Sequence, residues 1–129
     1  MPQNFLSYSR ADITKIDELK LIEYLEKDNK YHVWQDTQNI QGGEAWLNAI
    51  QEAIESSVVV MVFVTNNILD SQWVMFECAY AKAWGIPIIP YFFEAIQTDM
   101  KNKPLFELLS QQNGASSLAN LFSFIEDRA

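Results

Sequence analysis

The sequence is poor in several residue types that common functional sites require. It contains one cysteine, Cys78, and one histidine, His32. A single cysteine excludes an internal disulfide and is typical of a reducing compartment, so we expect a cytoplasmic protein. These two side chains also give no basis for a zinc site of the usual ligands, and we expect no metal. No glycine-rich phosphate-binding motif is present, which excludes the familiar nucleotide loops but not a nucleotide ligand.

Positive charge is also scarce. Nine lysines and arginines stand against 17 acidic residues, and the net charge is −8 with the histidine neutral. Arg10 and Arg128 are the only arginines. Because nucleic acids and anionic membranes bind clustered positive charge, we expect neither as a partner. Any anionic ligand must be held with few cations.

Long hydrophobic runs and a signal peptide are absent. The longest apolar runs cover residues 58–64 and 86–93, far short of the ~20 residues that span a bilayer. The chain turns polar within ten residues of Met1, so we expect no secretory leader. Its 129 residues are 49% hydrophobic and 13% aromatic, which predicts one ordered domain over residues 1–129.

Strand and helix patterns alternate along the chain. Apolar or β-branched runs predict strands at 5–9, 31–36, 58–64 and 86–93, and helical spacing predicts helices at 17–27, 46–54, 71–84, 104–109 and 118–125. Residues 114–117 are either a short fifth strand or a turn. This order predicts an α/β fold with a parallel sheet flanked by helices on both faces. Ligands of such sheets bind outside the carboxyl ends of the strands, so we expect the site there.

The predicted third helix carries the most informative pair. Trp73 and Glu77 are four residues apart and therefore neighbours on one helix face, which Tyr80 and Trp84 continue. We expect the carboxylate to be partly desolvated among aromatic residues and alanines, and such carboxylates cluster at functional sites. The alternative is a glutamate favoured modestly by the helix dipole.

Other candidates follow the strands. Arg10 comes just after the first strand, where it meets a phosphate or carboxylate or remains a solvated surface residue. Asp36 follows the second strand and opens a polar loop, where an Asx-turn is the alternative. Gly43 permits close approach of a ligand or marks a plain turn, and Trp46 begins a helix stripe whose default role is core packing.

A serine hydrolase is poorly supported by this sequence. Ser7 and Ser9 lack a histidine partner by sequence logic. The one histidine, His32, lies inside a predicted strand, where a packed or edge position is expected rather than a catalytic one.

Four segments together resemble Toll/interleukin-1 receptor (TIR) domains. They are FLSYSRAD at 5–12, VWQD at 33–36 followed by Ile40, Gly43, Trp46, Ile50 and Ile54, SQWVMFE at 71–77, and IPIIP at 86–90. The likeness runs in register from about residue 4 to 94. It implies a flavodoxin-like fold with strand order 2-1-3-4-5, of which the fifth strand lies beyond the matching region.

The resemblance implies two different functions. Many bacterial, plant and some animal TIR domains cleave NAD+ between nicotinamide and ribose, whereas others only assemble through TIR–TIR contacts. NAD-cleaving members have the glutamate that stands here as Glu77, four residues after Trp73. The resemblance therefore implies a catalytic Glu77, NAD+ as substrate and no cofactor, with either ADP-ribose or a cyclic isomer as product.

Substrate-binding roles follow for residues around this glutamate. The expected set is Tyr8, Arg10, Asp36, Gly43, Trp46 and Trp73. The resemblance also implies self-association through the BB loop, here from about Thr37 to Glu44, which completes the pocket of the next subunit.

The expected biological setting is bacterial anti-phage defence, with a fused or separate sensor protein, and the chain is either complete or the N-terminal part of a longer effector. A non-enzymatic TIR–TIR scaffold is the main alternative. A nucleoside 2-deoxyribosyltransferase-like enzyme shares the layered fold and a glutamate, but the Gly43 and Trp46 loop matches it less well. A phospho-accepting receiver domain is disfavoured because the acidic cluster after the first strand is absent.

Overall fold

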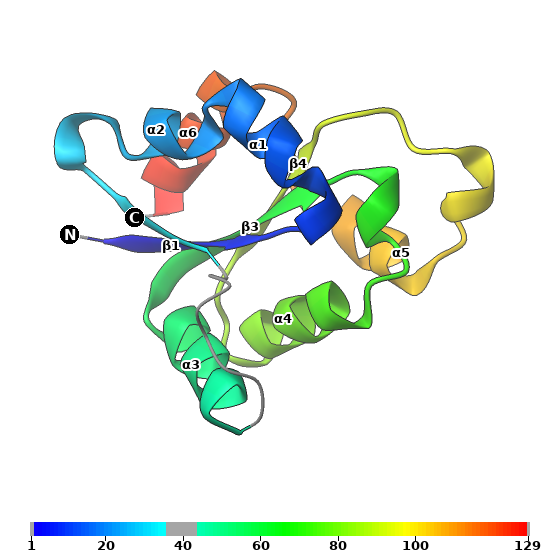
Figure 1. The fold of residues 1–129 in the computed structure, drawn as a ribbon, viewed down its shortest axis with the longest axis horizontal. Coiled ribbons are helices and arrows are strands. Elements are labelled where there is room, and N and C mark those ends of the chain that lie inside the picture. The colour runs from blue at the N-terminus through cyan, green and yellow to red at the C-terminus, as the bar shows by residue number, and fades with distance from the viewer. Residues whose placement is uncertain (1, 36–43, 129) are drawn as a thin grey trace.

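A four-stranded parallel sheet forms the centre of the molecule (Figure 1). The structure, a computed structural model, describes residues 2–35 and 44–128, without the side chain of Glu44. The strands are β1 (Gln3–Ser7), β2 (His32–Gln35), β3 (Ser57–Val64) and β4 (Ile88–Phe92), in the order β2-β1-β3-β4. This confirms the predicted α/β fold and the order of its first four strands.

Helices cover both faces of the sheet (Figure 1). One face packs against α1 (Ile13–Leu19), α2 (Leu21–Leu25) and α6 (Leu118–Arg128). The other packs against α3 (Glu44–Glu55), α4 (Gln72–Ala83) and α5 (Pro104–Ser110). Short 3-10 helices lie at Arg10–Asp12, Lys27–Asn29, Asn66–Ile68 and Thr98–Met100. No helix in the described part of the chain is long and apolar enough to cross a membrane.

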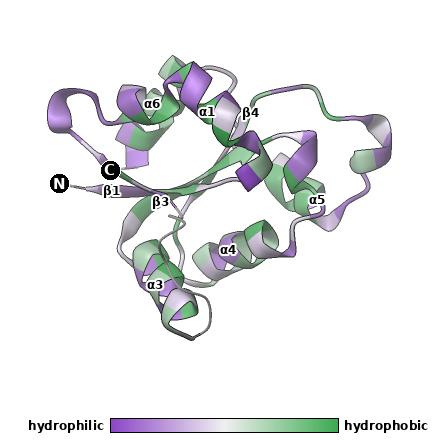
Figure 2. Ribbon diagram, viewed as in Figure 1, coloured by the Kyte–Doolittle hydropathy of each residue, from purple (hydrophilic) through white to green (hydrophobic). Residues whose placement is uncertain are grey.

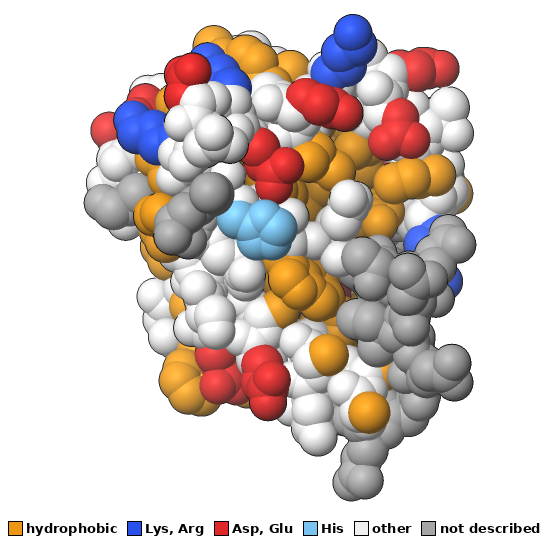
Figure 3. Space-filling view, turned by 60° about the vertical axis from the view of Figure 1, so that its left-hand side comes forward, with side chains coloured by type: hydrophobic (Ala, Val, Ile, Leu, Met, Phe, Trp, Pro, Cys, Tyr) orange, Lys and Arg blue, Asp and Glu red, His pale blue; other side chains and the backbone are white. Residues whose placement is uncertain are grey.

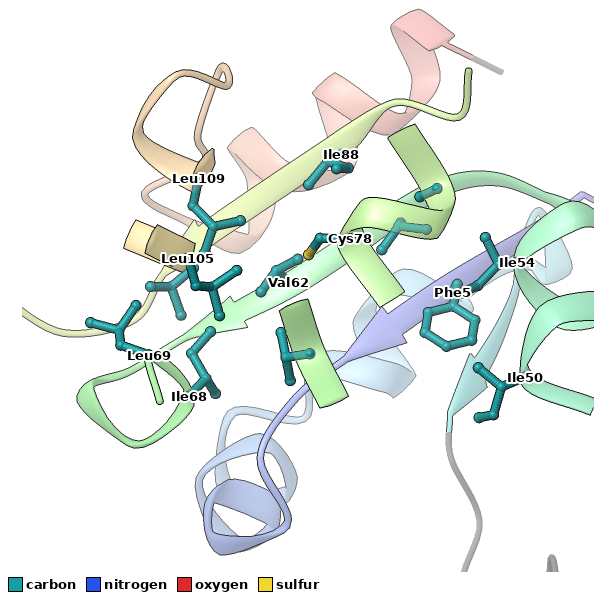
Figure 4. Packing of buried hydrophobic residues seen from close by; sticks show 14 of the residues in the cluster. Phe5, Ile50, Ile54, Val62, Ile68, Leu69, Cys78, Ile88, Leu105 and Leu109 are labelled. Atoms are coloured by element: carbon teal, nitrogen blue, oxygen red, sulfur yellow. The ribbon is translucent and has the colours of Figure 1, made fainter. Parts of the chain in front are cut away.

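The core has two halves because side chains of a strand alternate between its faces. In β3, Val60 and Val62 join the cluster under α3, α4 and α5, whereas Met61 and Phe63 join the cluster under α1, α2 and α6. Figure 4 shows the first cluster, where Val62 and Cys78 lie between the sheet and α4. The hydropathy colouring of Figure 2 shows β3 as apolar while α1 and α6 are mixed, as strands buried on both faces require.

At the outer edge of β4, where a fifth strand would pair, the structure has an isolated β-bridge. Ala115 pairs in parallel with Tyr91, and Phe92 N–H donates to Ala115 O at 3.1 Å while Ala115 N–H donates to Pro90 O at 2.7 Å. Pro90 has no N–H to offer on this outer side of β4, which limits further pairing. The segment 114–117 is thus closer to a turn than to a full strand.

The predicted helix at 17–27 is wrong in its bounds. Helix α1 begins earlier, at Ile13, and the chain breaks at Lys20, whose φ of 54° is left-handed. Lys20 N–H donates to Asp17 O and closes α1, and Lys20 O accepts from Tyr24 N–H and opens α2. Asp28 also has a positive φ, of 62°, and ends the helical region near the predicted place.

Helix α4 follows its local sequence signals closely. Ser71 accepts a hydrogen bond from Val74 N–H and caps its start. At the other end Gly85 takes a φ of 71°, and the N–H groups of Gly85 and Ile86 return to the carbonyls of Lys82 and Ala81. The helix that bears Glu77 is therefore fixed at both ends.

Candidate functional site

A cleft lies where β1 ends and α3 and α4 begin. The indole rings of Trp46 and Trp73 stack here with centroids 4.2 Å apart and planes 16° apart. The cleft has a volume of about 360 Å³, and its lining residues are Tyr8, Ser9, Arg10, Trp46, Ser71 and Trp73. The structure thus brings together four of the predicted substrate-binding residues, from segments far apart in the sequence.

Glu77 does not line this cleft but lies close to two of its lining residues along the chain and across the sheet. It lies one helical turn after Trp73, and its Oε1 accepts a 2.8 Å hydrogen bond from Ser7 Oγ. Ser7 directly precedes Tyr8 of the cleft wall. Glu77 is 3% exposed and Ser7 is 1% exposed, so the expected desolvation of the glutamate is confirmed and goes further than partial burial. The arrangement provides a buried carboxylate oriented by a neutral donor.

The thiol beside this glutamate is not a nucleophile. Cys78 is fully buried, and burial, together with the nearby charge of Glu77, raises its pKa to about 12. Since only the thiolate attacks, Cys78 stays inert near neutral pH. This leaves Glu77, and not Cys78, as the candidate reactive side chain of this turn.

An aromatic row runs along α4 from the cleft. Trp73 stacks on Phe76 at 5.1 Å, Phe76 contacts Tyr80 at 5.9 Å, and Tyr80 contacts Trp84 at 6.3 Å. Tyr80 donates to the carboxylate of Glu55 on α3, and this hydrogen bond raises the pKa of Tyr80. The four-residue spacing predicts Glu77 in this row, but the row contains Phe76 instead. Glu77 is buried and bonds to Ser7 of the sheet.

The other sequence-predicted residues either lie outside the described part of the chain or have structural contacts there. Asp36 and Gly43 lie outside the described residues, as does nearly all of the predicted BB loop. His32 lies on the edge strand β2, half-exposed beside Glu26, which confirms an edge position. Ser9 accepts from Ala11 N–H, and Ser7 bonds Glu77, so neither serine forms the pairing of a hydrolase triad.

Two polar residues near the site escaped the sequence reasoning. The sequence offers Ser7 only as a candidate nucleophile, whereas in the fold it is a strand residue that donates a hydrogen bond to Glu77 on α4. Asp12 is fully buried and accepts hydrogen bonds from Thr65 Oγ1 at 2.5 Å and Asn67 Nδ2 at 2.7 Å. Its position at the end of the predicted first strand was the available signal.

The acidic composition is visible on the surface. On the face drawn in Figure 3, which carries the single histidine, acidic side chains stand beside the lysine and arginine side chains. Arg10 is exposed at the cleft. Within residues 2–35 and 44–128, no three histidine, cysteine or acidic side chains gather as a metal site would require.

The fold is an α/β domain with a cleft at the carboxyl edge of a parallel sheet, the edge where ligands of this topology bind. The family model described as TIR domain matches residues 5–122. The chain therefore belongs to the TIR domain family. A search of curated proteins gave no match.

Solved structures of similar fold include immune and enzymatic proteins. The TIR domains of the activated Roq1 resistosome, which recognises the pathogen effector XopQ, share 18% identity with a TM-score of 0.61 over 86% of this chain and 69% of theirs. The Clostridium botulinum CMP N-glycosidase BcmB shares 13% with a TM-score of 0.62, over 96% and 98%. A 2-desoxiribosyltransferase from Leishmania mexicana shares 14% with a TM-score of 0.71, over the whole of both chains.

Proposed function

We propose that this TIR domain cleaves the bond between nicotinamide and ribose in NAD+, with Glu77 as the catalytic carboxylate. The observation that carries the proposal is the buried carboxylate of Glu77, which accepts a hydrogen bond from Ser7 and lies one helical turn after Trp73, a residue of the cleft with the two stacked tryptophans. The likeness in fold to a CMP N-glycosidase supports cleavage of an N-glycosidic bond as the reaction class.

The reaction needs a stabilised cation rather than a metal. When the bond from ribose C1′ to the pyridinium nitrogen breaks, the electron pair leaves with neutral nicotinamide and C1′ becomes positive. A carboxylate in a water-poor site stabilises this charge strongly. Water then adds its oxygen to C1′ and releases a proton, giving ADP-ribose. Attack by the adenine ring or a ribose hydroxyl of the same molecule gives a cyclic isomer instead.

The residues that line the cleft are assigned to the other groups of the NAD+ molecule. Trp46 and Trp73 offer ring faces to the cationic pyridinium, an attraction that ends when the ring leaves as a neutral molecule. We assign Arg10 to the pyrophosphate and Tyr8 to a ribose hydroxyl, because both residues line the cleft. We assign Asp36 and Gly43 to the opposite side of the pocket on the family resemblance.

Access to Glu77 connects catalysis with assembly. At 3% exposure, the carboxylate meets a substrate only after the cleft opens. We infer that self-association through the loop from about Thr37 to Glu44 supplies this opening and completes the pocket. A fused or separate sensor would trigger assembly, and bacterial anti-phage defence is the setting we propose.

One observation favours a second candidate function. A glutamate this buried also suits a module that only assembles, in which the Ser7–Glu77 bond fixes α4 against β1. In that case the domain is a non-enzymatic TIR–TIR scaffold.

Product chromatography separates the candidates. Concentrated protein, with and without a crowding agent, is incubated with NAD+, with CMP, and with a 2′-deoxynucleoside plus a free base. We expect nicotinamide release from NAD+ only, lost in Glu77→Ala and Glu77→Gln but retained in Glu107→Ala, a control at an exposed glutamate on α5. Undiminished release by Glu77→Ala would refute the catalytic role. Absence of release together with concentration-dependent assembly would identify the scaffold.

A further inference from the structure

A polar cluster behind the cleft joins its two walls. At its centre is the buried carboxylate of Asp12, which accepts from Thr65 Oγ1 and Asn67 Nδ2 and lies 3.3 Å from the ammonium of Lys15. Burying a carboxylate is costly unless donors compensate it. The three donors here make the carboxylate an anchor between the end of β1 and the loop after β3.

The Arg10 wall of the cleft, formed by residues 8–10, is held in place by Asp12. Asp12 N–H donates to Ser9 O at 2.8 Å and closes the 3-10 turn Arg10–Asp12, while Ser9 Oγ accepts from Ala11 N–H. Tyr8, Ser9 and Arg10 face the cleft. The position of Arg10 is therefore set by a 3-10 turn whose last residue, Asp12, is fixed by its hydrogen bonds to Thr65 and Asn67.

The Ser71 wall of the cleft, formed by Ser71 and Trp73, is connected to Asp12 through its donors in the loop after β3. Thr65 accepts from Asn67 N–H and caps the 3-10 helix Asn66–Ile68. Ser71 N–H then donates to Ile68 O at 2.8 Å, and Ser71 caps α4 in the cleft wall. A short path of hydrogen bonds and backbone thus connects Asp12 to the start of the helix that carries Trp73.

We propose that Asp12 is a positioning residue that sets the separation between the Arg10 wall and the Ser71 wall. This inference rests on the proposed cleavage of NAD+. Asp12 does not line the cleft, and the Ser7–Glu77 hydrogen bond is made between β1 and the second turn of α4 rather than by the Asp12 cluster. Loss of the Asp12 carboxylate therefore weakens substrate positioning while leaving the chemistry at Glu77 in place.

The test is a kinetic split in Asp12→Ala. We expect the KM for NAD+ to rise about tenfold with kcat within about twofold, because small misplacements of binding groups carry large kinetic effects. Asp12→Asn keeps one acceptor, and the Thr65 hydroxyl can turn to accept from the new amide, so its KM should lie between those of wild type and Asp12→Ala. Thr65→Val is the milder variant should Asp12→Ala not fold.

Glu126→Ala is the matched control, because it also removes a carboxylate paired with a lysine, Lys30, but on α6, which covers the face of the sheet opposite to α4. We expect its KM to be unchanged. Amide hydrogen exchange gives a readout that does not depend on activity. Protection at residue 12 and at Ser71 should fall in Asp12→Ala and Thr65→Val but persist in Glu126→Ala.

Two results overturn the inference: an unchanged KM in an active Asp12→Ala protein, or equal exchange in the Asp12 and Glu126 variants. A wild type that does not cleave NAD+ refutes the proposed function, while the exchange data still decide on the positioning role.

Discussion

Ser7 Oγ donates a 2.8 Å hydrogen bond to Glu77 Oε1 across 70 residues of sequence, and both side chains are buried. The bond joins the end of β1 to the second turn of α4. It joins Glu77, the candidate catalytic residue, to a serine for which the sequence alone predicts no such contact.

Replacing Ser7 by alanine should lower both activity and stability. A buried carboxylate that loses its donor costs about 1–3 kcal/mol, and a Glu77 free to rotate loses kcat rather than KM, because orientation matters most in the transition state. Urea unfolding and steady-state nicotinamide release measure the two effects. Ser7→Thr keeps the hydroxyl and should recover most of the kcat; equal kcat in Ser7→Ala and wild type would contradict the orienting role.

Much of the fold follows from local sequence signals. Strand β3 was predicted because it is an apolar run buried on both faces, and α4 because Ser71 and Gly85 mark its ends. The break at Lys20 left no such signal, since its left-handed φ is unusual for a lysine and reflects tertiary packing rather than residue type.

The site was predicted only in part, for a different physical reason. Spacing places Trp73 and Glu77 on neighbouring turns, but contacts across elements depend on topology. The bond from Ser7 to Glu77 and the anchor at Asp12 both need β1 to lie beside β3, which the strand order supplies and the local pattern does not. Asp36 and Gly43 stay predictions.

Trp73 should be needed for activity more than for folding. Trp73→Ala removes the stack on Trp46, and we expect at least about a tenfold rise in the KM for NAD+, the loss that follows when roughly 1.4 kcal/mol of ring contact disappears. Trp84, 56% exposed at the far end of the aromatic row, provides the matched control, and Trp84→Ala should leave KM unchanged. Equal effects of the two substitutions would argue against ring stacking in the cleft.

Asn4 is a buried polar residue whose replacement should stabilise the protein. It is fully buried in β1 beside Val33 and Val59, and among the described residues neither its Oδ1 nor its Nδ2 has a hydrogen-bond partner. Asn4→Leu keeps the branched shape with methyl groups in place of the unmet polar groups, so the free energy of unfolding should rise by about 1–2 kcal/mol. The urea midpoint measures this, and a lower midpoint than that of wild type would show that Asn4 has a partner in solution.

Gly114 should tolerate no larger residue. A Cβ at this position would lie 2.6 Å from Phe92 Cε2 and 2.9 Å from Cδ2, so Gly114→Ala must displace the Phe92 ring beside the Ala115 bridge, at a cost of about 1–3 kcal/mol. Gly85→Ala separates crowding from backbone strain, because its Cβ would meet nothing within 4 Å while its φ is +71°. It should cost only about 1 kcal/mol. Thermal unfolding of both variants gives the comparison.

Glu94 should contribute stability that disappears in acid. The backbone N–H of Asn66 and, less strongly, the charge of Lys15 hold the pKa of Glu94 below its usual value of 4.5. A carboxyl whose pKa is lower in the folded state stabilises above its unfolded pKa and loses that contribution as the pH falls through the folded pKa. The difference in unfolding free energy between wild type and Glu94→Gln should therefore be constant from pH 7 to about 5 and shrink below about 4.5. Lys15 does not interfere, because Asp12 raises its pKa above 10.5, so its own contribution is complete throughout the acidic range and is lost only at high pH. Urea unfolding at each pH measures the difference, and a value that stays constant down to pH 3 would contradict this role of Glu94.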